Sequence, residues 1–157
     1  MERIVLISII VVVLIIIAVI LGIYFFMSNS NQNNTPIDQN VNNPNDFKIQ
    51  GMRVEILKQG IGDGVKAGDY IIVHYVGKLA DGTKFDSSID RNLAFPFTVG
   101  QQDVIKGWDL GVIGMKIGEK RKLTIPPELA YGEQGRPPVI PGNSTLTFEV
   151  DLLKIGK

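Results

Sequence analysis

The chain has 157 residues, a length typical of one domain with accessory segments. Its 16 basic and 16 acidic residues balance, so the charge predicts binding neither to nucleic acid nor to an anionic membrane surface. The absence of cysteine excludes disulfides, thiolate nucleophiles, cysteine zinc sites and a lipidated cysteine anchor. The composition therefore favours a small domain without a redox or metal-thiolate function.

Residues 1–27 are predicted to form a transmembrane anchor. The run from Ile4 to Met27 has no charged residue, and as a helix it would be about 36 Å long, enough to cross a hydrocarbon core of about 30 Å. Aromatic residues 24–26 lie at its far end, where such side chains favour the headgroup region. Residues 28–30 resemble a weak cleavage site, so a removed signal peptide stays an alternative.

The orientation of this anchor follows from its basic flank. Arg3 precedes the span, and the next basic residue is Lys48. The positive-inside rule then keeps the amino terminus in the cytoplasm and exports the remainder. We therefore expect a single-pass membrane protein whose folded domain is extracytoplasmic.

The segment from Ser28 to Asp46 is predicted to be a disordered linker. It is rich in asparagine, and Ile37 and Val41 are its only branched apolar residues. It cannot bury enough apolar surface to offset the entropy of ordering. As a flexible coil it would span roughly 24 Å, so the domain formed by residues 47–157 would remain close to the bilayer.

The domain itself alternates apolar and polar residues, which is typical of half-buried strands. The last alternating segment is the clearest, because Leu146, Phe148, Val150 and Leu152 all fall on one face. Asp81-Gly82 is the pair favoured in tight hairpins and separates two of the strands. The predicted strands begin near Met52, Tyr70, Lys84, Phe95 and Leu146.

One segment has a helical period instead. Val104, Trp108 and Val112 are four residues apart, and Met115 extends the same apolar stripe. Two glycines within the segment each cost about 1 kcal/mol relative to alanine, so the helix requires support from a sheet. The predicted fold class is α+β, an antiparallel, twisted sheet of five to six strands wrapped around one short helix.

The candidate chemistry is limited by the single histidine. Ile71, Val73 and Tyr75 share one face of their strand, so His74 points to the opposite face and is predicted to lie at the surface. A hydrolase built on Asp86-Ser87-Ser88 would therefore lack its base. Scattered acidic residues and one isolated histidine also predict no metal site.

Three short stretches carry the functional information: residues 73–88, residues 104–108, and residues 130–132. They supply several aromatic and aliphatic side chains together with one carboxylate, Asp86. In order and spacing they resemble the FKBP-type peptidyl-prolyl cis-trans isomerases, and the resemblance runs from about Met52 to Ile155. Taken alone, Asp86 is explained as well by a local cap or ion pair as by a site, and Trp108 is better explained as a core residue.

The resemblance implies an isomerase that accelerates rotation about X-Pro bonds and assists folding near a membrane. It implies a floor at Trp108, and a flap from Pro126 to Pro141 with Ile140 as its apolar tip. The catalytic residues that it implies are Tyr75, Asp86, Ile105 and Tyr131. The implied substrate-binding residues are Phe85, Arg91, Phe95, Val104, Trp108, Ile140 and Phe148.

The same resemblance implies proline-containing polypeptides as substrates, rapamycin-like macrolides as ligands, no cofactor and a monomeric state. The chain departs from the common pattern at Leu93-Ala94, Arg136 and Pro138-Val139. These positions lie at the predicted rim, so they bear on substrate preference more than on activity. Two other functions stay open from the sequence: a non-catalytic module that binds proline-containing segments, and a membrane-tethered chaperone.

Overall fold

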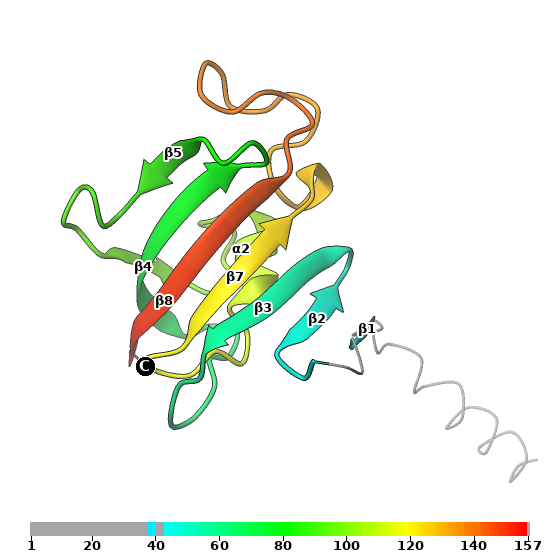
Figure 1. The fold of residues 1–157 in the computed structure, drawn as a ribbon. Coiled ribbons are helices and arrows are strands. Elements are labelled where there is room, and N and C mark those ends of the chain that lie inside the picture. Colours follow the sequence, from blue (N-terminus) through cyan, green and yellow to red (C-terminus); the bar gives the residue numbers. More distant parts are fainter. Residues whose placement is uncertain (1–37, 40–42, 157) are drawn as a thin grey trace, which may run out of the picture. The chain divides into compact units, whose positions relative to one another are not determined.

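The computed structural model describes Asp38–Gln39 and residues 43–156 (Figure 1). The predicted anchor at 1–27 and most of the predicted linker lie outside the described residues. Within the described part, no helix has the length and apolar character needed to cross a membrane. The elements are β1 (Asp38–Gln39), β2 (Asp46–Ile49), β3 (Met52–Lys58), β4 (Tyr70–Leu79), β5 (Lys84–Ser87), β6 (Phe95–Thr98), α2 (Lys106–Gly111), β7 (Lys120–Ile125), η1 (Pro127–Leu129) and β8 (Leu146–Gly156).

The described strands form one antiparallel sheet in the order β1-β2-β3-β7-β8-β4-β5, with β6 also paired to β4. Alternation decides which face is buried: Val73 and Tyr75 in β4, and Phe148 and Val150 in β8, all belong to the core. The predicted α+β class and antiparallel sheet are confirmed. The sheet has eight strands instead of five to six.

The first additional strands lie before Met52, partly within the range predicted as a linker. The carboxylate of Asp46 accepts hydrogen bonds from Arg53 Nε at 2.9 Å and Nη2 at 2.5 Å, which ties β2 to β3. Phe47 and Ile49 pack against the core. Asn-rich composition concealed this strand, because its apolar residues gain their burial only from the partner strand.

The remaining additional strand is β7, which pairs with β3 and β8. The strands predicted near Lys84 and Phe95 both form: β5 and β6 pair with the same side of β4, separated by the loop 88–94. Ser88 fixes the start of that loop. Its N–H donates to Tyr75 O at 3.1 Å, and its Oγ accepts from Tyr75 N at 2.8 Å. Because the loop 88–94 separates β5 from β6, Arg91 lies outside the sheet. Its position there matters for the function.

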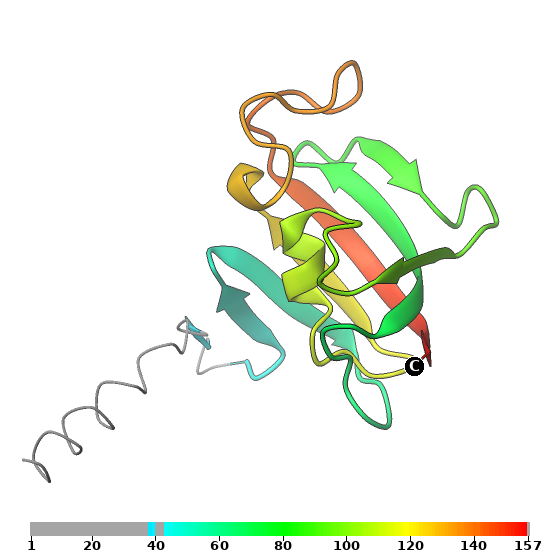
Figure 2. The ribbon, with the colours of Figure 1, turned by 180° about the vertical axis from the view of Figure 1, so that it is seen from behind.

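Helix α2 lies across the concave face of the sheet, as the view from behind shows (Figure 2). Its two glycines permit this close approach. A Cβ on Gly107 would lie 2.4 Å from Ile125 Cγ2, and one on Gly111 would lie 2.7 Å from Leu123 Cδ1. The helix is shorter than the predicted stripe, and Val112 and Met115 are buried beyond its end.

A buried ion pair holds the end of α2. Arg121 donates to Gly111 O at 2.8 Å and to Ile113 O at 2.9 Å, which satisfies carbonyl groups that the helix leaves free. Its Nε donates to Glu119 Oε1 at 2.5 Å, and Glu119 accepts Lys116 N at 3.0 Å through its other oxygen. The position of α2 on the sheet is thus fixed by close packing along one face of the helix and by hydrogen bonds at its C-terminal end.

We predict that Gly107→Ala destabilises the protein. Alanine gains up to about 1 kcal/mol of helix propensity, but overpacking typically costs about 1–3 kcal/mol. The 2.4 Å approach to Ile125 favours the upper end of that range, so the expected net loss is about 1–2 kcal/mol. Urea unfolding measures it. Lys106→Ala, on the exposed face of the same helix, is the control and should stay within about 0.5 kcal/mol of wild type; an equally stable Gly107→Ala variant would contradict the close-contact argument.

Candidate functional site

A cavity of about 550 Å³ opens beside α2 and is the candidate site. Every residue predicted for catalysis or substrate binding lines it, although these residues come from β4, β5, β6, α2, β8 and three loops. The structure therefore brings together all the residues that the resemblance singled out. The lining residues are Tyr75, Phe85, Asp86, Arg91, Phe95, Asp103, Val104, Ile105, Trp108, Tyr131, Arg136, Pro137, Val139, Ile140 and Phe148.

The floor of the cavity is the Trp108 indole, which is 4% exposed. It meets Tyr75 at a centroid distance of 5.0 Å and Phe148 at 5.3 Å, both nearly perpendicular. Phe95 makes a third edge contact at 6.0 Å. Rings that pack edge to face hold each other in one orientation. The ring plane of Trp108 is consequently fixed before any ligand arrives.

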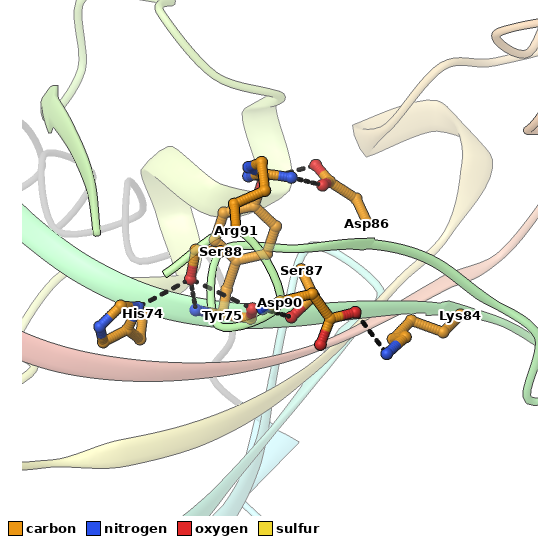
Figure 3. A network of polar contacts seen from close by, with 8 residues as sticks. All are labelled: His74, Tyr75, Lys84, Asp86, Ser87, Ser88, Asp90 and Arg91. Atoms are coloured by element: carbon orange, nitrogen blue, oxygen red, sulfur yellow. Dashed lines mark hydrogen bonds and ion pairs between the residues drawn. The ribbon is translucent and has the colours of Figure 1, made fainter. Parts of the chain in front are cut away.

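One wall is a polar triad of Tyr75, Asp86 and Arg91 (Figure 3). The Tyr75 hydroxyl donates to Asp86 Oδ2 at 2.5 Å and accepts from Arg91 Nη2 at 2.9 Å. Arg91 also forms an ion pair with the other oxygen of Asp86. Each member therefore bonds to the other two, which orients all three groups at the cavity wall.

The pKa values in this triad are shifted by burial and by the partners. Burial alone would raise the pKa of Asp86, but the hydrogen bonds from Tyr75 and Arg91 outweigh it, so the pKa of Asp86 lies below its ordinary value. Burial, followed by the bond to Asp86, raises the pKa of Tyr75. At neutral pH the triad thus contains an ionised carboxylate and a neutral phenol, neither of which is poised to exchange protons.

His74 lies behind this wall and is not among the lining residues. The prediction that it is a surface residue needs correction, because it is half-buried and its Nδ1 lies 3.0 Å from Ser88 Oγ (Figure 3). Ser88 itself is fully buried and bonds to the backbone of Tyr75. A half-buried histidine in contact with a fully buried serine supports the strand and offers no accessible nucleophile.

Besides the buried Nε1 of Trp108, two uncharged hydrogen-bond donors of the lining residues have no partner in the described part of the chain. The N–H of Ile105 precedes the first turn of α2, where backbone donors have no acceptor within the helix. The Tyr131 hydroxyl follows η1 and is half-buried at the opposite wall. Both are available to the carbonyl oxygens of a bound peptide.

The flap differs in one detail from its prediction. Ile140, predicted as an apolar tip, is only 3% exposed and packs with the core, whereas the neighbouring Val139 is 52% exposed. Reciprocal backbone bonds explain the inward turn, since Arg136 N donates to Ile140 O at 2.7 Å and Ile140 N donates to Arg136 O at 3.0 Å. This bridge turns Ile140 toward the aromatic floor.

Asp103 and Pro137 line the cavity but were not predicted as site residues. Arg136 and Val139 were both predicted to lie at the rim, and both line the cavity. The signal for Asp103 was its place just before the apolar stripe that begins at Val104. A single charged residue there belongs to no apolar or polar periodicity, so nothing in the sequence singled it out.

The arrangement is an apolar, aromatic cup with fixed hydrogen-bonding groups on its walls. Across residues 38–39 and 43–156, no group of three or more histidine or acidic side chains is placed to hold a metal ion. The carboxylate of Asp86 is committed to Tyr75 and Arg91. Such a cavity suits a compact apolar ring with carbonyl groups on both sides, which defines a class of domain that binds proline-containing peptides.

Comparison with known proteins agrees with this class. The family model described as FKBP-type peptidyl-prolyl cis-trans isomerase matches residues 62–153. The chain therefore belongs to the FKBP-type peptidyl-prolyl cis-trans isomerase family.

Individual relatives show how far the likeness extends. Human peptidyl-prolyl cis-trans isomerase FKBP2 is 61% identical over 90 residues, covering 57% of this chain and 63% of the relative. FK506-binding protein 1A of Aspergillus fumigatus is 56% identical over 106 residues, covering 67% of this chain and 95% of the relative. The crystal structure of FkpA from Escherichia coli matches with a TM-score of 0.62 and 44% identity, covering 67% of this chain and 48% of that one. The chain thus spans somewhat less than two thirds of the length of its FKBP2 relative.

We predict that Asp86→Asn makes stability less dependent on acid pH. Because the folded pKa of Asp86 is lowered, its stabilising contribution is fully present above the ordinary unfolded value near 3.9 and is lost as the pH falls through the folded value. Urea midpoints at pH 7 to pH 2 should therefore show a gap between wild type and variant that narrows below about pH 4. Asp63→Asn, an exposed loop change, is the control. A gap of constant size throughout would show that the triad does not depend on the charge of Asp86.

Proposed function

We propose that this chain is a peptidyl-prolyl cis-trans isomerase that acts on proline-containing polypeptides. The observation that carries the proposal is the cavity, in which the Trp108 floor, the triad of Tyr75, Asp86 and Arg91, and the free donors at Ile105 and Tyr131 converge. Membership of the family supports the same activity.

The reaction needs no bond to be made or broken. Rotation about a peptide C–N bond is opposed by a barrier of about 18–20 kcal/mol, because amide resonance must be lost. For an X-Pro bond the uncatalysed process takes tens to hundreds of seconds. The planar amide is strongly dipolar, whereas the twisted form has lost much of its charge separation. An apolar cup therefore favours the twisted form over the planar one, and this differential binding lowers the barrier.

The residues of the cavity have separate tasks in this mechanism. Trp108 supports the proline ring, with Phe95 and Phe148 against its edges. The Ile105 N–H and the Tyr131 hydroxyl donate to the flanking carbonyl groups, so the peptide is held while one side rotates. The triad of Tyr75, Asp86 and Arg91 keeps this wall of the cavity rigid. None of its groups transfers a proton during the reaction.

The same cavity is proposed to accept rapamycin-like macrolides. Several relatives are named FK506-binding proteins, and a rigid macrocycle that fills an aromatic cavity has little conformational entropy to lose. Bound macrolide would occupy the floor at Trp108 and compete with peptide. This competition gives a direct link between the cavity and the activity.

We predict that the full chain accelerates cis–trans exchange of a Leu-Pro peptide, measured by exchange spectroscopy, and that a rapamycin-like macrolide abolishes the acceleration. Tyr131→Phe removes one hydrogen bond to substrate and should lower kcat/KM about two- to tenfold. Tyr70→Phe is the matched control, because Tyr70 is 47% exposed and does not line the cavity.

The outcomes separate the alternatives. Peptide binding without faster exchange would show a binding module and overturn the isomerase proposal. Equal losses in both tyrosine variants would remove Tyr131 from the mechanism. Refolding assistance that persists with the macrolide bound would indicate a chaperone activity independent of the cavity.

We also propose that residues 1–27 anchor the domain in a membrane and that the domain faces the extracytoplasmic side. The support is the uncharged run from Ile4 to Met27 and the basic Arg3 before it. An uncleaved anchor would bring the isomerase to chains that fold close to the membrane.

Protease added to intact cells whose outer membrane face is accessible tests this orientation. Cleavage within the predicted linker 28–46 should release a fragment of the size of residues 47–157 from the membrane fraction without lysis. Release only after lysis would place the domain on the cytoplasmic side. A shortened population that is soluble from the outset would indicate removal of the first segment, and a full-length soluble population would indicate the absence of an anchor.

A further inference from the structure

Two charged side chains line the cavity without an ionic partner. Four charged residues line it in all: Asp86, Arg91, Asp103 and Arg136. Asp86 and Arg91 pair with each other, so their charges largely cancel. Asp103 and Arg136 form no ion pair with any residue of the described part. The charge that a peptide encounters at the mouth of this cavity therefore comes from these two residues.

The two charges belong to different segments of the rim. Asp103 lies in the loop that leads into α2, whereas Arg136 lies in the segment between η1 and β8 that forms the flap. Figure 2 shows the flap segment above α2 and the loop that leads into α2 beside the helix. A peptide that lies between these two segments would meet a negative charge from one segment and a positive charge from the other.

The backbone beneath Arg136 is fixed, although its side chain is exposed. Its N–H and carbonyl both bond to Ile140, and its carbonyl also accepts from Val139 N at 3.2 Å. The exposed guanidinium is therefore presented from a rigid support, which reduces the ordering cost of an interaction with substrate. Lys106 and Glu133, the nearest charged residues in sequence to Asp103 and Arg136, do not line the cavity.

We propose that this rim selects substrates by charge order: proline segments with an acidic residue on one side of the proline and a basic residue on the other, in one direction of the chain. The inference rests on the proposed isomerase function and deepens it to a substrate class. The cup at Trp108 binds the proline ring irrespective of sequence, and Asp103 and Arg136 supply the discrimination. Opposite charges at the two ends favour one direction and disfavour its reverse.

The test compares two peptides of identical composition, Glu-Leu-Pro-Leu-Lys and Lys-Leu-Pro-Leu-Glu, with acetylated and amidated ends. Gln-Leu-Pro-Leu-Gln is the uncharged reference. All three have zero net charge, so general electrostatic attraction to the protein is the same for each. Exchange spectroscopy with the full chain gives kcat/KM for each peptide at low and at high salt.

We expect one charged peptide to be turned over about five- to twentyfold more efficiently than the other at low salt. Each exposed charge contact contributes up to about fivefold, and reversing the peptide replaces two favourable contacts by two unfavourable ones. The difference should shrink at 1 M salt, where the Debye length falls to about 3 Å. Equal efficiency of the two peptides would overturn the inference.

A charge exchange within the rim gives the decisive comparison. Arg136→Glu combined with Asp103→Lys keeps the net charge and should reverse the preference between the two peptides. The matched control is Lys66→Glu combined with Asp63→Lys, which exchanges two exposed charges on the loop before β4, outside the cavity, and should retain the wild-type preference. A preference that survives the rim exchange would assign selectivity to other residues.

The reference peptide separates this inference from the function on which it rests. No acceleration of the uncharged peptide or of either charged peptide would contradict the isomerase proposal itself. Acceleration of the uncharged peptide, together with equal rates for both charged peptides, would contradict only the charge-order inference.

Discussion

The close contact between α2 and β7 is the constraint on which the site depends. Gly107 and Gly111 place the helix backbone directly over Ile125 and Leu123, where any side chain on the helix would collide. Only at this distance can the Trp108 indole lie flat at the base of the cavity, among rings from β4 and β8. The two glycines lower the helix propensity of α2, but their lack of a side chain is what allows the aromatic floor to form.

Rigidity of the walls follows from a second set of interactions. The loop 88–94 brings Arg91 to Asp86, and Ser88 anchors that loop on the backbone of Tyr75. The hydroxyl of Tyr75 then completes the triad from the strand beneath. A cavity that lowers a rotational barrier by favouring the less polar form must keep its own dipoles in place, and a triad with mutually satisfied groups does this. The lowered pKa of Asp86 is a consequence of that arrangement.

Local periodicity predicts which residues of a strand or helix are buried. It predicts little about the pairing of one element with another. The alternation around Val73 and the stripe through Trp108 are visible in the sequence because burial on one face repeats along one element. Strand β2 was missed because Asp46 and Phe47 are stabilised by a partner, Arg53 and β3 respectively, that local composition does not reveal. The buried pair of Arg121 and Glu119 was missed for the same reason. The site residues were located through resemblance, since no periodic pattern connects β5 to α2 or to the flap.

The floor of the cavity binds by apolar burial, whereas the rim binds by contacts between exposed charges. Under the proposed function, the first determines activity and the second determines selectivity. Burial against Trp108 depends on apolar area and shape, which any proline ring provides, so the floor is indifferent to neighbouring residues in the substrate. Interactions with Asp103 and Arg136 act at exposed positions, where each contributes little but where two contacts of opposite sign add along the direction of the chain. A change at the rim can therefore alter which sequences are processed without touching the rings that lower the barrier. Under the proposed function, we therefore expect substitutions in the flap of this chain to change substrate preference more than activity.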